Sequence, residues 1–176
     1  MATVIDGSAS VTINSGAVLG ITSGTSQPTT SGTSVDFTSI PSWVKRVTVM
    51  FSGVSTSGTS PYQIQLGSGS ITTSGYLGQG SYISSSVVSN SVYSSGFVVV
   101  NSPGAAFGYS GFATICLFSG NTWCESSSIG TTSGSNAQFF SAGSIGLSGT
   151  LDRVRITTVN GTDTFDAGSV NILYEG

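Results

Sequence analysis

The carboxylates are the side chains of this sequence best suited to acid–base chemistry, because the chain contains no histidine. The absence of histidine excludes Ser-His-Asp and Cys-His catalysis and most zinc or copper sites. Glycoside hydrolysis stays open, since it needs only two carboxylates about 5 to 10 Å apart. The seven acids are Asp6, Asp36, Glu125, Asp152, Asp163, Asp166 and Glu175.

The distribution of these acids argues against an active site. All of them except Glu125 lie towards the two ends of the chain, where all four cations also lie. This arrangement favours ion pairs at strand ends over an isolated acid pair in a cleft, so we predict a protein that is not an enzyme and uses no cofactor or metal. The residues predicted to form structural ion pairs are Lys45, Arg46, Asp152, Arg153, Arg155, Asp163 and Asp166.

One loop has the oxygen side chains of a possible calcium site. Asn160, Asp163 and Asp166 are closely spaced, which suits Ca²⁺. The loop lacks the spacing and the glutamate of an EF-hand, however. We favour an Asx turn with an ion bridge to Arg153 or Arg155.

Two turn signals predict β-hairpins. The first is the segment 119–121, and the second is Asn160-Gly161, the stronger two-residue signal. A three-residue loop at 119–121 would place Cys116 directly opposite Cys124. We favour packing of two small apolar side chains over a disulfide, because synthesis in the cytosol disfavours the bridge.

Tyrosines supply the remaining binding feature of the sequence. A tyrosine ring among serine and glycine suits the face of a sugar or a protein partner. Most of the aromatic residues are expected in the core or in subunit packing. The candidate ligand contacts are Tyr82, Tyr93 and Tyr109.

The charge content excludes several classes of partner. Only 6% of the residues are charged and the formal net charge is −3, with four Lys and Arg residues in total. Binding to a nucleic-acid backbone or to an anionic membrane is therefore not expected. The longest purely apolar run, Phe97–Val100, is too short for a membrane span. The start, Met1–Asp6, has no basic or apolar signal region, so we expect a chain made in the cytoplasm without membrane insertion.

Hydrophobic patterning predicts an all-β fold. The chain is 38% hydrophobic, with a mean hydropathy of +0.27, which is too apolar for a disordered chain. Glycine interrupts most helix-length windows, whereas residues 44–51 and 62–66 alternate between apolar and polar side chains. Many short strands separated by turn clusters predict an antiparallel β-sandwich of jelly-roll type.

The first 34 residues differ from the rest of the chain. We divide the sequence into an N-terminal arm with its linker, residues 1–34, and a sandwich body, residues 35–176. Residues 21–34 form the linker, because they repeat a turn-rich Ser/Gly/Thr tetrapeptide around Pro28. An ordinary first strand of the sandwich is the open alternative to an arm. The predicted attachment residues are Val4, Ile5, Val11 and Ile13.

Two long runs resemble a module of tailed-bacteriophage virion proteins. The first is residues 33–60, TSVDFTSIPSWVKRVTVMFSGVSTSGTS, which continues through 63–67 and 73–76. The second is residues 147–175, LSGTLDRVRITTVNGTDTFDAGSVNILYE, and 119–123 is a weaker echo between them. The resemblance implies a structural or adhesin unit of the virion, without catalytic residues.

The resemblance leaves two roles open. One is a capsid decoration or cement protein, which would bind the major capsid protein through a short arm that adds a strand to its partner. The other is the receptor-binding tip of a tail fibre, in contact with a tail protein and a host cell-surface glycan. Only about 34 residues precede the body, so we favour the decoration protein. Both roles place the chain in the virion, and many such proteins are trimers.

Composition independently favours self-association. Between Arg46 and Asp152 the single charged residue is Glu125. A surface built from this stretch repels a second copy weakly and has no charged residues to guard its edge strands. Closed symmetric oligomers are the ordinary outcome. We therefore expect residues 47–151 to form the oligomer interface first and a receptor contact second.

Overall fold

The computed structural model is a β-sandwich, and it describes residues 12–13, 16–17, 20–134 and 136–176. Every regular element in these ranges is a strand, and the strands pair antiparallel. The predicted all-β sandwich is confirmed, while its jelly-roll type stays a prediction. No helix capable of spanning a membrane occurs in the described ranges.

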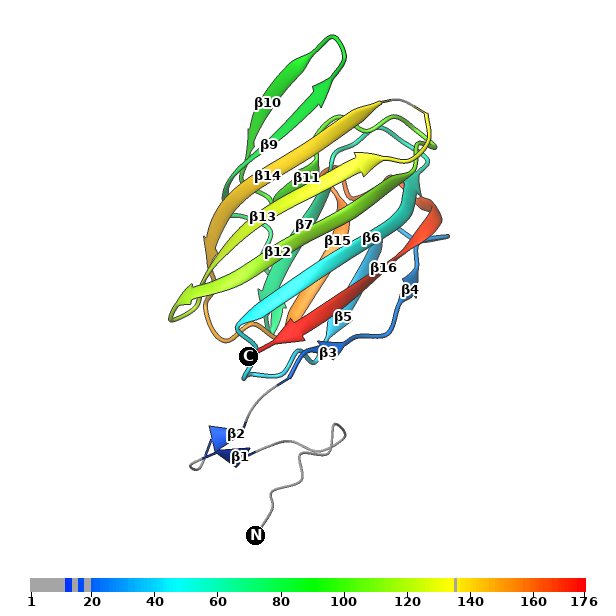
Figure 1. Cartoon of the computed structure of the whole chain (residues 1–176). Helices are drawn as coiled ribbons and strands as arrows, with labels where there is room; N and C mark the ends of the chain where they lie inside the picture. Colours follow the sequence, from blue (N-terminus) through cyan, green and yellow to red (C-terminus); the bar gives the residue numbers. More distant parts are fainter. Residues whose placement is uncertain (1–11, 14–15, 18–19, 135) are drawn as a thin grey trace.

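A large sheet forms one layer of the sandwich, and it faces the viewer in Figure 1. A short strand, β4 (Gln27–Pro28), also pairs with the strand β16 of this sheet. In spatial order the strands of the large sheet are β10 (Val88–Tyr93), β9 (Leu77–Ser84), β14 (Ala137–Gly146), β13 (Thr122–Thr131), β12 (Tyr109–Ser119), β6 (Arg46–Thr56), β16 (Phe165–Glu175) and β3 (Thr22–Ser23).

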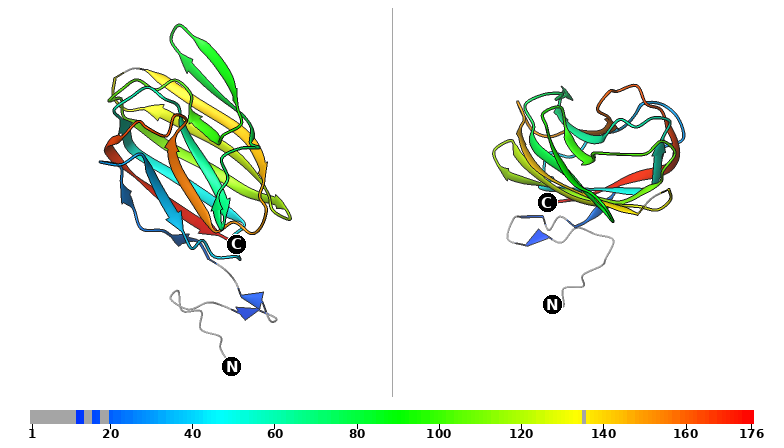
Figure 2. Two further views of the ribbon diagram at one scale, coloured as in Figure 1. Left: turned by 180° about the vertical axis from the view of Figure 1, so that it is seen from behind. Right: turned by 90° about the horizontal axis from the view of Figure 1, so that it is seen from above.

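A smaller sheet forms the second layer and covers part of the first, as the view from above in Figure 2 shows. Outside the sandwich, β1 (Thr12–Ile13) pairs with β2 (Gly16–Ala17). In spatial order the strands of the small sheet are β11 (Phe97–Val100), β7 (Tyr62–Ser68), β15 (Arg153–Thr158) and β5 (Ser34–Thr38), with β8 (Ser70–Ile71) paired to β7.

The core lies between the two sheets, where the alternating side chains meet. Val47, Val49 and Phe51 of β6 are buried, as are Tyr62 and Ile64 of β7. Their burial follows from the two-residue period of a strand, which directs every second side chain to one face. Each fully buried aliphatic or aromatic side chain stabilises the fold by about 1.5 to 3 kcal/mol.

The predicted hairpin at Asn160-Gly161 is wrong. Strand β15 lies in the small sheet, whereas β16 lies in the large sheet. Both edges of β15 are already paired, with β5 and β7. The chain therefore passes from the small sheet to the large sheet, where β16 pairs with β6. Gly161 still serves the turn, with a φ of 66° that favours glycine.

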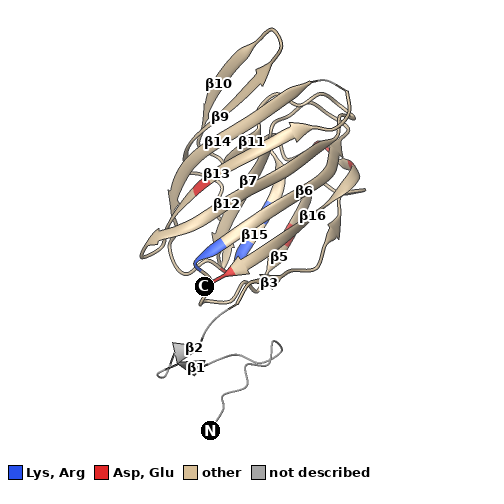
Figure 3. Ribbon diagram, viewed as in Figure 1, with Lys and Arg blue, Asp and Glu red and all other residues tan. Residues whose placement is uncertain are grey.

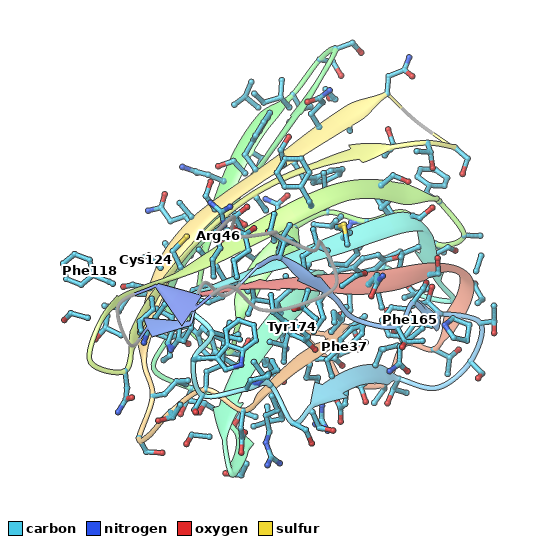
Figure 4. All side chains as sticks on the ribbon, turned by 60° about the horizontal axis from the view of Figure 1, so that its bottom comes forward. Phe37, Arg46, Phe118, Cys124, Phe165 and Tyr174 are labelled. Carbon is cyan, nitrogen blue, oxygen red and sulfur yellow. The ribbon has the colours of Figure 1, made fainter. Side chains whose placement is uncertain are left out.

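The hairpin of β12 and β13 is confirmed, and its register places Cys116 directly opposite Cys124. Both cysteines are exposed free thiols. The two cysteines are not bridged, in agreement with the alternative favoured over a disulfide, but they do not pack in the core, because both side chains lie on the outer face of the sheet. Figure 4 shows Phe118 projecting from the end of this hairpin, with Cys124 nearby.

The predicted linker residues lie along the edge of the large sheet. Gly24 donates its N–H to Ile172 of β16 at 2.7 Å. The hydroxyl of Thr29 donates to the carbonyl of Ala167 at 2.7 Å, and Thr29 is completely buried. Part of the linker is thus an edge strand of the body. Of the predicted attachment residues, Val4, Ile5 and Val11 lie outside the described residues, and Ile13 lies in β1.

Candidate functional site

The outer face of the large sheet carries no charged side chain across five adjacent strands. The register aligns Phe112 of β12, Ser128 of β13 and Phe140 of β14 in one row, and the neighbouring rows follow every second residue. We call this surface the neutral face. It comprises Val88, Asn90, Val92, Leu77, Gln79, Ser81, Ile83, Gln138, Phe140, Ala142, Ser144, Cys124, Ser126, Ser128, Gly130, Ser110, Phe112, Thr114 and Cys116.

Large apolar side chains of the neutral face are open to solvent. Leu77, Val88 and Val92 are between 74% and 77% exposed, and Phe112 is 52% exposed. Two of them, Val88 and Val92, lie on β10, which is the edge strand of the sheet. An exposed edge strand with apolar side chains is a template for pairing with another chain.

Apart from the buried Glu125 on β13, the described charged residues lie on and around β5, β6, β15 and β16, as Figure 3 shows. Arg46 of β6 lies next to Cys116, at the border of the neutral face. Among the described residues, three arginines form ion pairs. Arg153 Nε binds Asp152 Oδ1 at 2.7 Å, and this bond lowers the pKa of Asp152. Arg155 binds both carboxylate oxygens of Asp36 at 2.7 Å. The third pair joins Arg46 to Glu175.

The loop that could hold calcium is an Asx turn. Asn160 Oδ1 accepts hydrogen bonds from the N–H groups of Thr162 and Asp163. Asp163 accepts the N–H of Ser60, and Asp166 accepts the hydroxyl of Ser55.

The expected bridge from this loop to Arg153 or Arg155 is wrong, because those arginines bind Asp152 and Asp36. Lys45 contributes backbone hydrogen bonds, one from its N–H to Glu175 and one to its carbonyl from Leu117. In the described ranges no group of three or more Cys, Asp or Glu residues could hold a metal ion.

Glu125 is the one acid of the central region, and it points into the sandwich. The side chain is 4% exposed, and its Oε1 accepts the hydroxyl of Ser141 at 2.8 Å. The hydroxyls of Ser127 and Ser141 lie 2.5 Å apart. Glu125 Oε2 has no hydrogen-bond partner among the described residues. Burial raises the pKa of this carboxyl to about 7, since a low dielectric disfavours the charged form.

The three candidate tyrosines occupy different environments. The prediction that Tyr109 contacts a ligand is wrong, because this residue is 1% exposed and belongs to the core. Its hydroxyl accepts the N–H of Gly104 at 2.8 Å, and its ring packs edge-on against Tyr62. Tyr82 is partly exposed on β9, and Tyr93 is partly exposed on β10.

A cleft of about 510 Å³ adjoins Tyr82 where β9, the start of β14 and the 101–108 loop meet. We call it the Tyr82 cleft. Sequence reasoning found Tyr82 but missed its companions, because serines and an asparagine in loops carry no spacing signal. The cleft is lined by Tyr82, Ser84, Ser85, Ser86, Ser102, Pro103, Gly104, Phe107, Asn136, Ala137 and Phe139.

Comparisons with known proteins found no family model, curated protein or solved structure that matches this chain. The fold presents two surfaces that could bind a partner, the neutral face and the Tyr82 cleft.

Proposed function

We propose that this chain is a non-enzymatic structural protein of a bacteriophage virion that assembles as a homotrimer. The role we favour is a capsid decoration or cement protein. The neutral face carries this proposal, because the surface has no charge and exposes large apolar side chains from four strands. An apolar patch of this kind marks a protein–protein contact.

A second copy of this chain is the partner that the neutral face fits best. Two uncharged surfaces approach each other without electrostatic repulsion, and each carries serine and threonine hydroxyls that can pair across the contact. In an assembly with three-fold symmetry, the neutral face is buried equally in all three copies.

The attachment to the capsid lattice is assigned to residues 1–34. Support comes from the part of this segment that the structure describes, since β3 and β4 add to the edge of β16 by backbone pairing. The same mode of recognition, in which an extended segment adds a strand to an exposed edge, would let the arm bind the major capsid protein.

A receptor-binding tail protein is the second candidate. The observation that favours it is the Tyr82 cleft, which combines aromatic rings with neutral hydroxyl groups. Such a cleft suits a host cell-surface glycan. In this role the neutral face would still hold the trimer together, and a tail protein would replace the capsid as the partner.

Two measurements test the proposal. Light scattering of the purified chain is expected to give three times the 17.7 kDa chain mass. Electron microscopy of virions labelled with an antibody against residues 35–176 is expected to place the label on the head lattice. Label at the tail tip would favour the second candidate. Virions that bind no antibody and contain no copy of this chain would overturn both candidate functions.

A further inference from the structure

We propose that the Tyr82 cleft is a binding site for a neutral oligosaccharide. This inference rests on the second candidate function, for which it names the ligand class. It does not depend on the structural role, because the Tyr82 cleft and the neutral face use opposite sides of β9. Tyr82 pairs with Phe139 and shares its inward direction, whereas the adjacent Ile83 points to the neutral face.

The fold holds the Tyr82 ring in a fixed orientation. The ring stacks on Phe139 with centroids 5.8 Å apart and an angle of 23° between the planes. Phe139 is 2% exposed and packs in turn against Tyr109 of the core. A tyrosine backed by a buried ring loses little conformational entropy when a ligand binds, and its other side can pack on the C–H face of a sugar.

Polar groups surround this aromatic platform without any charge. Ser85 and Ser86 contribute hydroxyls from the turn after β9, and Asn136 contributes an amide. The hydroxyl of Ser84 is bonded to the backbone of Val87. Hydroxyl and amide groups both donate and accept hydrogen bonds, as sugar hydroxyls require. Among the described residues, no Lys, Arg, Asp or Glu lines the cleft, so an anionic ligand would lack a counter-charge.

The dimensions favour an oligosaccharide over a single sugar. The volume of about 510 Å³ falls within the roughly 300 to 1,000 Å³ of small-molecule sites. A second cleft, of about 290 Å³, shares Asn136 with it. The described residues that line the two clefts are uncharged. Asn136 therefore lies where the two clefts adjoin, which gives room for more than one sugar unit.

Titration calorimetry of the full chain with four neutral hexasaccharides tests this site. The probes are maltohexaose, cellohexaose, mannohexaose and N-acetylchitohexaose, with hexagalacturonate as the anionic control. We expect at least one neutral probe to bind in the micromolar to millimolar range and the anionic probe to bind at least 10-fold more weakly. Absence of binding by all four neutral probes at 10 mM would overturn the proposal, as would tighter binding of hexagalacturonate.

Two variants locate the binding. Tyr82→Ala is expected to weaken it at least 10-fold through loss of the stacking ring. Asn136→Lys, at an exposed position, is expected to weaken it similarly by placing a charged chain at the junction. The matched control is Ser148→Lys, an exposed residue beyond the other end of β14, which should bind as the unmodified protein does. Because Tyr82→Ala also removes packing from Phe139, Asn136→Lys carries the test if the first variant does not fold.

Light scattering on the same samples separates this proposal from the trimer. A trimer that binds none of the neutral probes would overturn the saccharide site alone. A monomer that binds a probe, with the binding lost in Asn136→Lys, would support the site and contradict the assembly. Binding that survives both Tyr82→Ala and Asn136→Lys would place the saccharide elsewhere and overturn the assignment.

Discussion

The outer faces of the two sheets differ in the side chains that they expose to solvent. On the small sheet, Arg155 and Asp36 form a two-bonded ion pair. Ser95 covers the amides beside it, because its hydroxyl donates to Gln63 Oε1 at 2.8 Å and its carbonyl accepts Gln65 Nε2 at 2.8 Å. On the large sheet, the neutral face has no ion pair and leaves large apolar side chains uncovered.

The two faces therefore differ in how much a binding partner would gain by covering them. The polar side chains just named on the small sheet are hydrogen-bonded within the chain, so a partner gains little by covering them. The neutral face holds no charge that would have to lose its water, so covering it gives a hydrophobic gain at little desolvation cost. This difference is the basis of the proposed trimer, in which a second copy would cover the neutral face.

A charge in the centre of the neutral face is expected to have the largest effect. Ser128→Lys would bring identical cations together in the assembly, each deprived of water. We expect association to weaken at least 1,000-fold, or about 4 kcal/mol, so that light scattering reports a monomer. The matched control is Thr162→Lys in the exposed turn before β16, which should remain a trimer. A trimeric Ser128→Lys protein would contradict the interface.

The buried carboxyl inside the large sheet predicts a dependence of stability on pH. Folding raises the pKa of Glu125 from its ordinary value of 4.5 to about 7, so the folded state holds the proton more tightly than the unfolded state. The free energy of unfolding should therefore fall as the pH rises from about 4.5 to about 7 and then level off, by about 3 kcal/mol in total.

Denaturant titrations at pH 5 and pH 8 check this dependence. Since the chain contains no histidine, few other groups titrate in this range. Glu125→Gln keeps the shape and removes the titration, so its stability should differ little between the two pH values. An unmodified protein that is equally stable at pH 5 and pH 8 would show that Glu125 does not hold its proton inside the sandwich.

The two thiols report whether the neutral face is covered. Cys116 and Cys124 are exposed in the single chain and belong to the neutral face. A maleimide should label them at least 10-fold more slowly in the trimer than in the Ser128→Lys monomer, because assembly excludes the reagent. Equal labelling rates would place these thiols outside the contact.

The smallest effect is expected on the small sheet. Asp36→Asn removes the partner of Arg155, but both side chains are more than a third exposed, so water and salt screen the pair. Chemical denaturation should show a loss of about 0.5 kcal/mol, with no change in oligomeric state. A loss above about 2 kcal/mol, or dissociation, would mean that this face also carries an interface.

The hydrophobic pattern of the sequence predicted the strands that have one face in the core and the other face in solvent. In β6, Val47, Val49 and Phe51 alternate with Arg46, Thr48 and Met50, and the structure buries the first set. Strands β9 and β10 were missed, because serine, glycine and asparagine separate their few apolar side chains, and most of these point to solvent instead of the core. The hairpin error at Asn160-Gly161 has a related cause. A turn motif fixes the local bend but not which sheet the next strand joins.

The candidate sites were harder to predict than the fold. Tyr82 and Tyr109 lie in similar Ser/Gly-rich segments, yet one borders a cleft and the other is enclosed by Tyr62 and Phe139. Both side chains point inward, and the order of the strands separates them: β12 lies in the interior of the large sheet, whereas β9 is next to its edge strand. That order depends on strands far away in the sequence. The sequence showed that the central stretch lacks charge. That its uncharged side chains form one continuous face could not be predicted, because the face depends on the spatial order of five strands.

The short strands β3 and β4 limit how the large sheet can grow. Continued growth of one sheet by strand pairing needs two open edges, so that each added copy exposes a new one. On the large sheet one edge is β10, while the other carries the two-residue strands β3 and β4, and β4 ends in Pro28, which has no N–H to donate. Pairing of large sheets through β10 would therefore join two copies and leave no long regular edge strand for a third.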